Sequence, residues 1–180
     1  MAIILSIIYY KDYFMKKIIL LFLPIVLLSS SLFAQERLYS FIGVQTSTSK
    51  FDKITAPTIG VKYGKQSKDI RTAISYNYGK NSDDTFQTLI MQIDTGILTN
   101  TFKKSPLKPY IGASLGLIQH KNNNLISYTD KGYLLGANTG VTYIFNNNMD
   151  FDLGYRFLKT SKMKEIKDIN DLSFSMHYFY

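Results

Sequence analysis

The sequence predicts an all-β protein: an eight-stranded antiparallel up-and-down transmembrane β-barrel. Apolar residues recur at every second position through most of the chain, which is the spacing of one face of a strand. About eight such segments occur, and an even number of strands suits closure of an antiparallel barrel. The two faces also differ, because one holds Leu, Ile, Val, Tyr and Phe while the other collects glycine and the charged residues.

The first 34 residues have the pattern of a secretory signal peptide. Lys16 and Lys17 precede an apolar run that ends in small residues up to Ala34. That run of roughly 16 residues is short of the ~20 that a transmembrane helix needs. We therefore predict a signal peptide at 1–34, with translation starting at Met15 and cleavage after Ala34, and an outer-membrane β-barrel domain at 35–180. An unusually long signal peptide that includes residues 1–14 is the alternative.

Four strands are expected in the first half of the barrel, at 37–47, 57–65, 69–80 and 85–99. The facing of the first is ambiguous, because Phe41 and Ile42 point to opposite sides and both are apolar. The third, "IRTAISYNY", and the fourth, "QTLIMQIDTGI", alternate clearly, with the charged residues of both strands on the less apolar face.

Four more strands are expected at 107–119, 132–145, 149–159 and 170–180. "MDFDLGYRF" is the clearest case, since every second residue from Met149 is apolar and the residues between are Asp, Gly or Arg. "LSFSMHYFY" repeats the pattern up to the last residue. The connections "KQSKD" and "NNN" are short, whereas "TSKFDKITA", "KNSDD", "KNNNLISYTD" and "TSKMKEIKDI" are mostly longer; only "NTFKKSPLK" departs from this alternation. Short turns at one end and longer loops at the other are typical of outer-membrane barrels.

A soluble, lipocalin-like barrel is the alternative fold, but its polar face would meet water and its apolar face a ligand. Here the polar face carries glycine and compact charged residues, which suit a narrow lumen. The apolar face lacks charge in mid-strand, as expected where a charge at the bilayer midplane costs ~2–4 kcal/mol. A membrane barrel is therefore favoured. The inward-facing charges are predicted to form a structural network: Arg71, Asp94, Asp150, Asp152 and Arg156.

The stretch "YLLGANTGVTYIFNNNMDFDLGYRF" resembles the small outer-membrane β-barrel domain family, which includes OmpA-type transmembrane domains and OmpX/Ail-type barrels of the porin family. The resemblance is carried by Gly136, Gly140, Val141 and Tyr143, followed by Gly154, Tyr155 and Arg156. It implies a place in the outer membrane of a Gram-negative bacterium, among relatives that are adhesins, anchors or barrels of unknown role. The last strand also resembles the signal read by the barrel assembly machinery, through Phe174, Met176, Tyr178 and Tyr180.

Catalysis and transport are less favoured functions. Eight strands enclose an interior that side chains fill, so a general pore is not expected, although a narrow ion or water channel is an alternative. A lipid-A-modifying enzyme would need a His, a Ser and an acid together. His120 is expected to start a loop, and His177 to face the lumen with Ser173 and Ser175; neither predicts a triad. The chain has no Cys, and no cofactor or metal is expected.

A surface-binding role remains. The predicted outer loops place Lys159, Lys162, Lys164, Lys167 and Tyr128 where lipopolysaccharide phosphates or host surface ligands could reach them. Charge attraction of this kind is screened beyond a Debye length of about 8 Å, and a loop kept basic only for solubility is the alternative. The net charge of +8 does not predict nucleic-acid binding in an exported protein whose lysines are dispersed.

Overall fold

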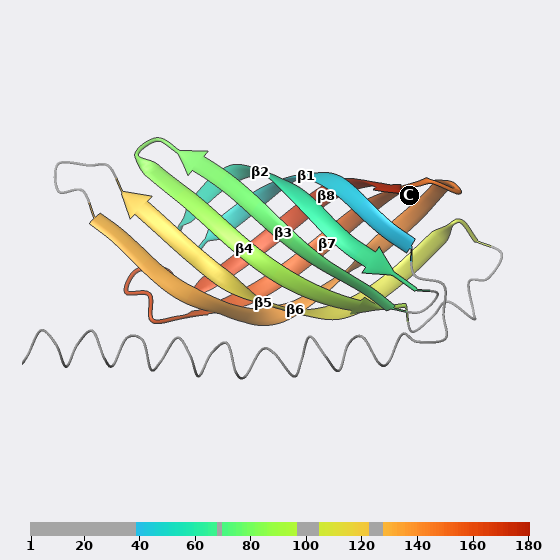
Figure 1. Cartoon of the computed structure of the whole chain (residues 1–180). Coiled ribbons are helices and arrows are strands. Elements are labelled where there is room, and N and C mark those ends of the chain that lie inside the picture. Colours follow the sequence, from blue (N-terminus) through green and yellow to red (C-terminus); the bar gives the residue numbers. More distant parts are fainter. Residues whose placement is uncertain (1–38, 68–69, 97–104, 123–127) are drawn as a thin grey trace, which may run out of the picture. The chain divides into compact units, whose positions relative to one another are not determined.

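The computed structural model describes residues 39–67, 70–96, 105–122 and 128–180, which form a closed eight-stranded barrel (Figure 1). Each strand pairs antiparallel with its neighbours in sequence, and the last strand pairs with the first. The strands are β1 (Tyr39–Phe51), β2 (Ile54–Gln66), β3 (Ile70–Asn81), β4 (Asp84–Thr95), β5 (Leu107–Asn122), β6 (Tyr128–Asn146), β7 (Met149–Ser161) and β8 (Asp168–Phe179). The predicted signal peptide and its cleavage site lie outside the described residues.

Burial alternates along the strands as the sequence predicted, except at the start of β5 and the end of β6. On β1, Phe41 is fully buried in the interior and Ile42 is 53% exposed, which settles the facing of that strand. The outward positions form an apolar belt of exposed Leu, Ile, Val, Phe and Tyr side chains. In the part of the chain that the structure describes, no helix has the length and hydropathy of a membrane span.

Several strands are longer than predicted. The first and third connections at one end of the barrel were expected to be loops, but Phe51 pairs with Ile54 and Asn81 with Asp84, so only residues 52–53 and 82–83 turn. Asp52 and Ser82 have φ values of 55° and 44°, in the left-handed region that tight hairpins require. Strand pairing therefore continues through residues that the sequence pattern assigned to loops.

The two ends of the barrel are distinguished by their connections. We call the end with the turns 52–53 and 82–83 and the connections 123–127 and 162–167 the hairpin end, and the other the terminal end. The terminal end holds Tyr39, Phe179 and the connections 67–69, 96–106 and 147–148. The longest connection, 96–106, therefore lies at the end that was predicted to have short turns.

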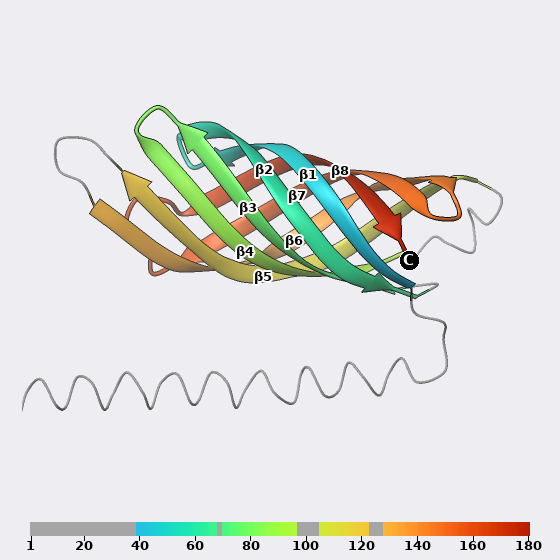
Figure 2. The ribbon, with the colours of Figure 1, turned by 45° about the horizontal axis from the view of Figure 1, so that its top comes forward.

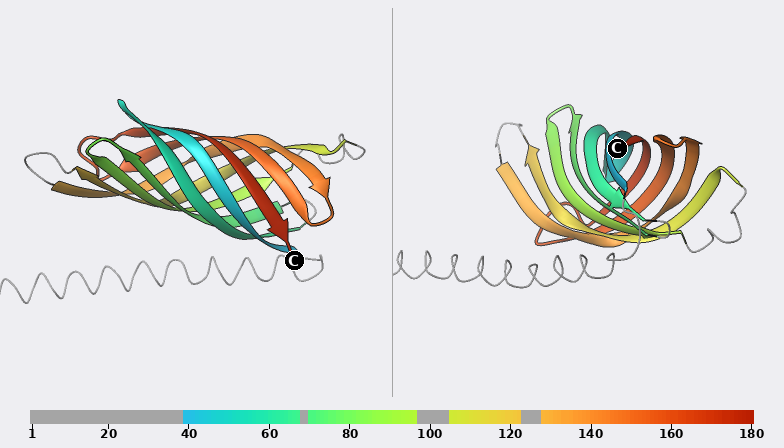
Figure 3. Two further views of the ribbon diagram at one scale, coloured as in Figure 1. Left: turned by 90° about the horizontal axis from the view of Figure 1, so that it is seen from above. Right: turned by 45° about the vertical axis from the view of Figure 1, so that its right-hand side comes forward.

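The strands are tilted with respect to the long direction of the barrel, and β1 lies beside β8 along its length (Figures 2 and 3). Phe41 to Phe51 of β1 pair continuously with Phe179 to Ile169 of β8. This pairing removes both free edges, which would otherwise be sites for aggregation.

Candidate functional site: the barrel interior and its rim

Arg71 organises the polar interior towards the terminal end. It lies on β3, and its two terminal nitrogens reach across to β7, at 3.4 Å from Oδ2 of Asp150 and 3.5 Å from Oδ2 of Asp152. The guanidinium also donates to Oγ1 of Thr142 at 3.0 Å, and it stands 5.9 Å from the ring centroid of Phe41. A rigid fork of donors suits two carboxylates on one strand. The structure therefore brings together three of the five predicted network residues.

The other two predicted residues belong to a second group. Asp94 pairs with Arg71 in the strand register, yet its carboxylate accepts from the amides of Gln92, at 2.8 and 2.9 Å, and Asn138. Arg156 donates to Oε1 of Gln92 at 3.5 Å and makes its ion pair with Asp171 on β8. Asp94 and Arg156 are thus linked through Gln92.

Two buried charged residues of the interior, Lys62 and Asp171, were not among those predicted from the sequence, whereas His177 faces the lumen as predicted. Lys62 on β2 is 7% exposed, and its Nζ donates to Oγ of Ser175 at 3.1 Å. Asp171 is the partner of Arg156, and Nδ1 of His177 lies 2.6 Å from Oδ1 of Asp150. The alternation itself could have found Lys62, because it lies between outward-facing Val61 and Tyr63.

Two glycines of the family-like motif make room for Tyr110. Gly140 and Gly154 face each other across β6 and β7. A Cβ at either would lie 2.5 or 2.7 Å from Oη of Tyr110. With both positions free of side chains, that hydroxyl reaches inward and donates to Oδ1 of Asp152 at 3.0 Å. Tyr110 is therefore an interior residue and not part of the outward apolar belt.

An apolar plug closes the interior at the hairpin end. Its rings stack, with Phe51 and Phe86 at 3.9 Å between centroids and Phe86 and His120 at 4.7 Å. Burying this much aliphatic and aromatic surface is strongly favourable. We define the plug by its buried apolar members: Phe51, Ala56, Phe86, Ile90, Ile118, Leu134, Leu158, Ile166 and Ile169.

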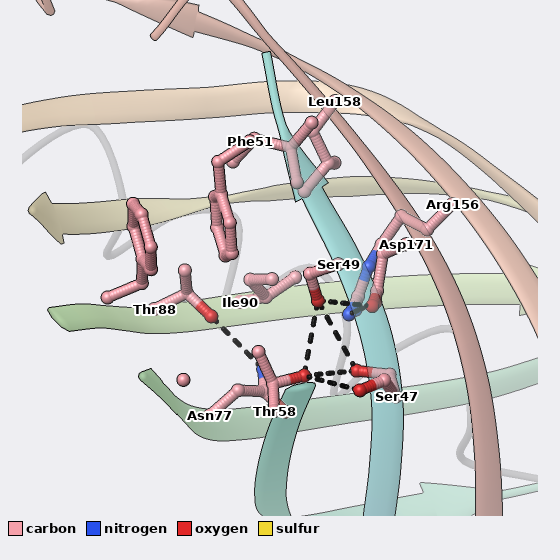
Figure 4. A pocket seen from close by; sticks show the side chains of 13 residues that line it. Ser47, Ser49, Phe51, Thr58, Asn77, Thr88, Ile90, Arg156, Leu158 and Asp171 are labelled. Carbon is pink, nitrogen blue, oxygen red and sulfur yellow. Dashed lines mark hydrogen bonds and ion pairs between the residues drawn. The ribbon is translucent and has the colours of Figure 1, made fainter. Parts of the chain in front are cut away.

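A cavity of about 10 Å³ lies between the plug and the Arg156 group, which is room for about one water molecule. Figure 4 shows its lining, with Ser49 donating to Asp171 at 2.7 Å and contacting Thr58 at 3.1 Å. At the terminal end, a larger cavity of about 120 Å³ is bounded by Arg71, Tyr110 and Asp150 among others. The interior is therefore wider at the terminal end and filled towards the hairpin end.

The expectation that His120 starts a loop is wrong, because β5 continues to Asn122. His120 is fully buried, and its Nε2 lies 2.7 Å from Oδ1 of Asp84 at the start of β4. Asn122 donates to the same carboxylate oxygen at 2.9 Å. His120 thus completes the inner face of the hairpin end by stacking on Phe86.

The segment 162–167, between β7 and β8, folds over the plug. Ile166 is 1% exposed and belongs to the plug, and Met163 packs partly against it. The backbone N–H of Lys164 donates to Asp130 at 2.9 Å, and Tyr128 donates to Glu165. Apolar side chains of this segment therefore face inward, and its position is fixed by hydrogen bonds to β6.

The predicted basic contacts lie at this end and are exposed. Lys162, Lys164 and Lys167 belong to the segment 162–167, and Lys159 lies on the outward face of β7 opposite Asp168. Lys162 has φ 70°, and its Nζ stands 5.0 Å from the ring centroid of Tyr133. Tyr128 is half-buried at the start of β6. The structure thus gathers all five residues around one rim.

The predicted assembly residues all face outward. Phe174, Met176 and Tyr178 are 48%, 38% and 50% exposed, and Tyr180 after the strand is 66% exposed. Phe179, between Tyr178 and Tyr180, points inward, and its ring centroid lies 5.4 Å from that of Phe41. The backbone N–H of Tyr180 donates to the carbonyl of Ser40 at 3.0 Å, so the last residue joins the first strand.

Comparisons with known proteins agree with this architecture. Neisserial surface protein A is 23% identical, with a TM-score of 0.65, and the match covers 79% of this chain and 97% of that one. Outer membrane protein H (OprH) of Pseudomonas aeruginosa is 18% identical, with a TM-score of 0.57, over 79% and 99% of the two chains. Ail of Yersinia pestis, solved in a phospholipid bilayer nanodisc, is 15% identical, with a TM-score of 0.51, over 80% and 100%.

At these identities the structural likeness shows the fold alone. A comparison with curated proteins found no match. Residues 20–179, however, match the family described as the outer membrane protein beta-barrel domain. That match covers most of the chain, and it agrees with the closed barrel, the apolar belt and the polar interior described above. The chain belongs to the outer membrane protein beta-barrel domain family, and it is an outer-membrane protein.

Proposed function

We propose that this protein acts at the cell surface, in an adhesin-like role, by binding polyanionic partners through the lysines in and beside segment 162–167: Lys159, Lys162, Lys164 and Lys167. The barrel then serves as a closed structural anchor in the outer membrane. The observation that carries this proposal is the plug capped by segment 162–167. It leaves the exposed basic rim, and not the interior, as the surface that a ligand can reach.

The distribution of lysines supports an orientation with the hairpin end outside and both termini in the periplasm. Among the described residues, nine exposed lysines belong to the hairpin end, whereas the sequence has five lysines in or beside the connections of the terminal end, Lys65, Lys68, Lys103, Lys104 and Lys108. The four lysines in and beside segment 162–167 would be attracted to lipopolysaccharide phosphates and to anionic host surfaces within about a Debye length, ~8 Å. The nine are Lys50, Lys53, Lys80, Lys121, Lys131, Lys159, Lys162, Lys164 and Lys167.

In this proposal the chain reaches the membrane by export through its signal peptide and by recognition of its last strand by the barrel assembly machinery. The outward-facing row Phe174, Met176, Tyr178 and Tyr180 supports that route. Catalysis is not part of the proposal, because His120 and His177 are both fully buried and each lies against an Asp inside the barrel. Replacing both His residues should accordingly leave the composition of lipid A unchanged.

The test is binding of fluorescent dextran sulfate to cells that express the protein, with neutral dextran as the baseline. The variant Lys164→Gln/Lys167→Gln removes two charges from segment 162–167. The matched control, Lys50→Gln/Lys53→Gln, removes two charges from the β1–β2 hairpin at the same end. We expect the first variant to bind about threefold less dextran sulfate than the control, since exposed charges contribute up to about 1 kcal/mol each. Equal binding by the two variants and the wild type would contradict the proposal.

A further inference from the structure

A groove of about 450 Å³ lies on the outer wall of the barrel, across β3 to β6 near the hairpin end. Outward-facing Tyr76, Leu89, Leu117 and Tyr133 form its apolar floor and sides. Lys131 and Lys162 stand at its edge, with Gln87 and Gln119 between the lysines and the apolar part. A groove with one apolar part and one basic part suits an amphiphile.

The strand register places these residues in ordered rows. Tyr76 pairs with Leu89, Leu89 with Leu117, and Leu117 with Tyr133, which gives one continuous apolar row. Two residues further towards the hairpin end, the next outward row is Tyr78, Gln87, Gln119 and Lys131, and the row after it is Lys80, Thr85, Lys121 and Thr129. Successive outward rows are about 7 Å apart along a strand. The wall therefore changes from apolar to amide to basic over roughly the depth of a lipid headgroup region.

The charged residues that line the groove, Lys131 and Lys162, are both basic. None of the described outward positions of β3, β4, β5 and β6 is acidic. Asp130 precedes Lys131 in the sequence, but its carboxylate accepts from the backbone N–H groups of Lys131 and Lys164, both at 2.9 Å. The ammonium of Lys162 stands over the ring of Tyr133 at 5.0 Å, which holds a positive charge directly above the apolar row.

We infer that this groove binds one phosphate-bearing glycolipid of the outer leaflet. Its acyl chain lies along Leu89 and Leu117, its phosphate meets Lys131 and Lys162, and the amides of Gln87 and Gln119 face the sugar hydroxyls. Charge-assisted contacts to phosphate are among the stronger polar interactions, and the apolar row selects a lipid over a free anion. The inference rests on the proposed placement of the hairpin end at the outer leaflet.

The test uses the full barrel refolded in detergent, and native mass spectrometry measures the fraction that retains lipid. The probes are bisphosphorylated lipid A, the same lipid after removal of its phosphates, and inorganic phosphate. Lys131→Gln/Lys162→Gln is the groove variant. Lys50→Gln/Lys53→Gln is the matched control, because it removes two exposed charges from the same end, one on β1 and one in the turn after it, neither of which lines the groove. Equal heat-modifiable gel migration of all three proteins shows that each is folded.

We expect wild type and control to retain the bisphosphorylated lipid equally and the groove variant to retain it about tenfold less, since two charge-assisted contacts are lost. Dephosphorylated lipid should be retained as weakly by the wild type as the bisphosphorylated lipid is by the groove variant, and inorganic phosphate should not compete. Equal retention by both double variants, or competition by inorganic phosphate, would overturn the inference. Because Lys164 and Lys167 are intact here, loss of dextran sulfate binding and loss of lipid retention are separate outcomes.

Discussion

Individual charges are held inside this barrel by partners from other strands. Arg156 and Asp171 are 5% and 3% exposed and face each other across β7 and β8. Arg71 instead reaches past its register partner Asp94 to two carboxylates on β7. A buried charge without a partner is much less stable than a pair, so these contacts determine how far each residue tolerates change.

Replacing one member of such a pair should lower the free energy of unfolding more than replacing both. We expect Arg156→Met to lower the free energy of unfolding by about 3–5 kcal/mol, because Asp171 is left buried and uncompensated. Arg156→Met/Asp171→Leu should recover a large part of that loss. Urea unfolding in detergent micelles, followed by circular dichroism, measures both, with Lys65→Met as an exposed control. If the double variant loses as much free energy of unfolding as Arg156→Met and Asp171→Leu lose together, the two residues do not form a stabilising ion pair.

At the scale of elements, β8 and the segment before it have different structural roles. Segment 162–167 covers the hairpin end by inserting Ile166 into the plug, whereas β8 closes the barrel against β1. Tyr180 extends that closure by one backbone hydrogen bond to Ser40. A change at the last residue therefore affects the closing strand, while an exposed change in segment 162–167 leaves the strand pairing intact.

This difference predicts an effect on assembly. Tyr180→Asp, or deletion of Tyr180, should reduce the amount of folded protein in the outer membrane more than Lys164→Asp does. The physical reason is that Tyr180 belongs to the outward apolar row of the closing strand, whereas the side chain of Lys164 is exposed. The measurement is the heat-modifiable band in outer-membrane fractions. Equal amounts of that band from both variants would show that the row is not an assembly signal.

At the scale of the whole molecule, the alternation of apolar and polar residues predicts which way side chains face, but not where the strands end. The eight strands and the inward charges follow from period two, because lipid on one side and a narrow lumen on the other demand different side chains. Phe51 was assigned to a loop and Phe86 to the start of the strand predicted at 85–99, and no apolar cluster was expected inside the lumen. They face inward because the closed mouth of the barrel is itself a small apolar core.

The sequence pattern also does not predict which interior charges contact one another. Arg71 and Asp94 lie on adjacent strands and pair in register, so local spacing favours their contact. The structure joins Arg71 to Asp150 and Asp152 instead, because closure of the barrel brings β3 opposite β7 across a narrow lumen. Strand tilt and stagger set such contacts, and alternation contains neither quantity.

Single-channel recording in planar lipid bilayers tests most directly the central claim that the interior of the barrel is closed. The wild-type protein should give no stable conductance steps, because the plug and the Arg156 group fill the interior. The variant Phe51→Ala/Phe86→Ala/Ile166→Ala, which removes the centre of the plug, should give small steps in the same bilayers. Steady, open steps from the wild-type protein would contradict the account.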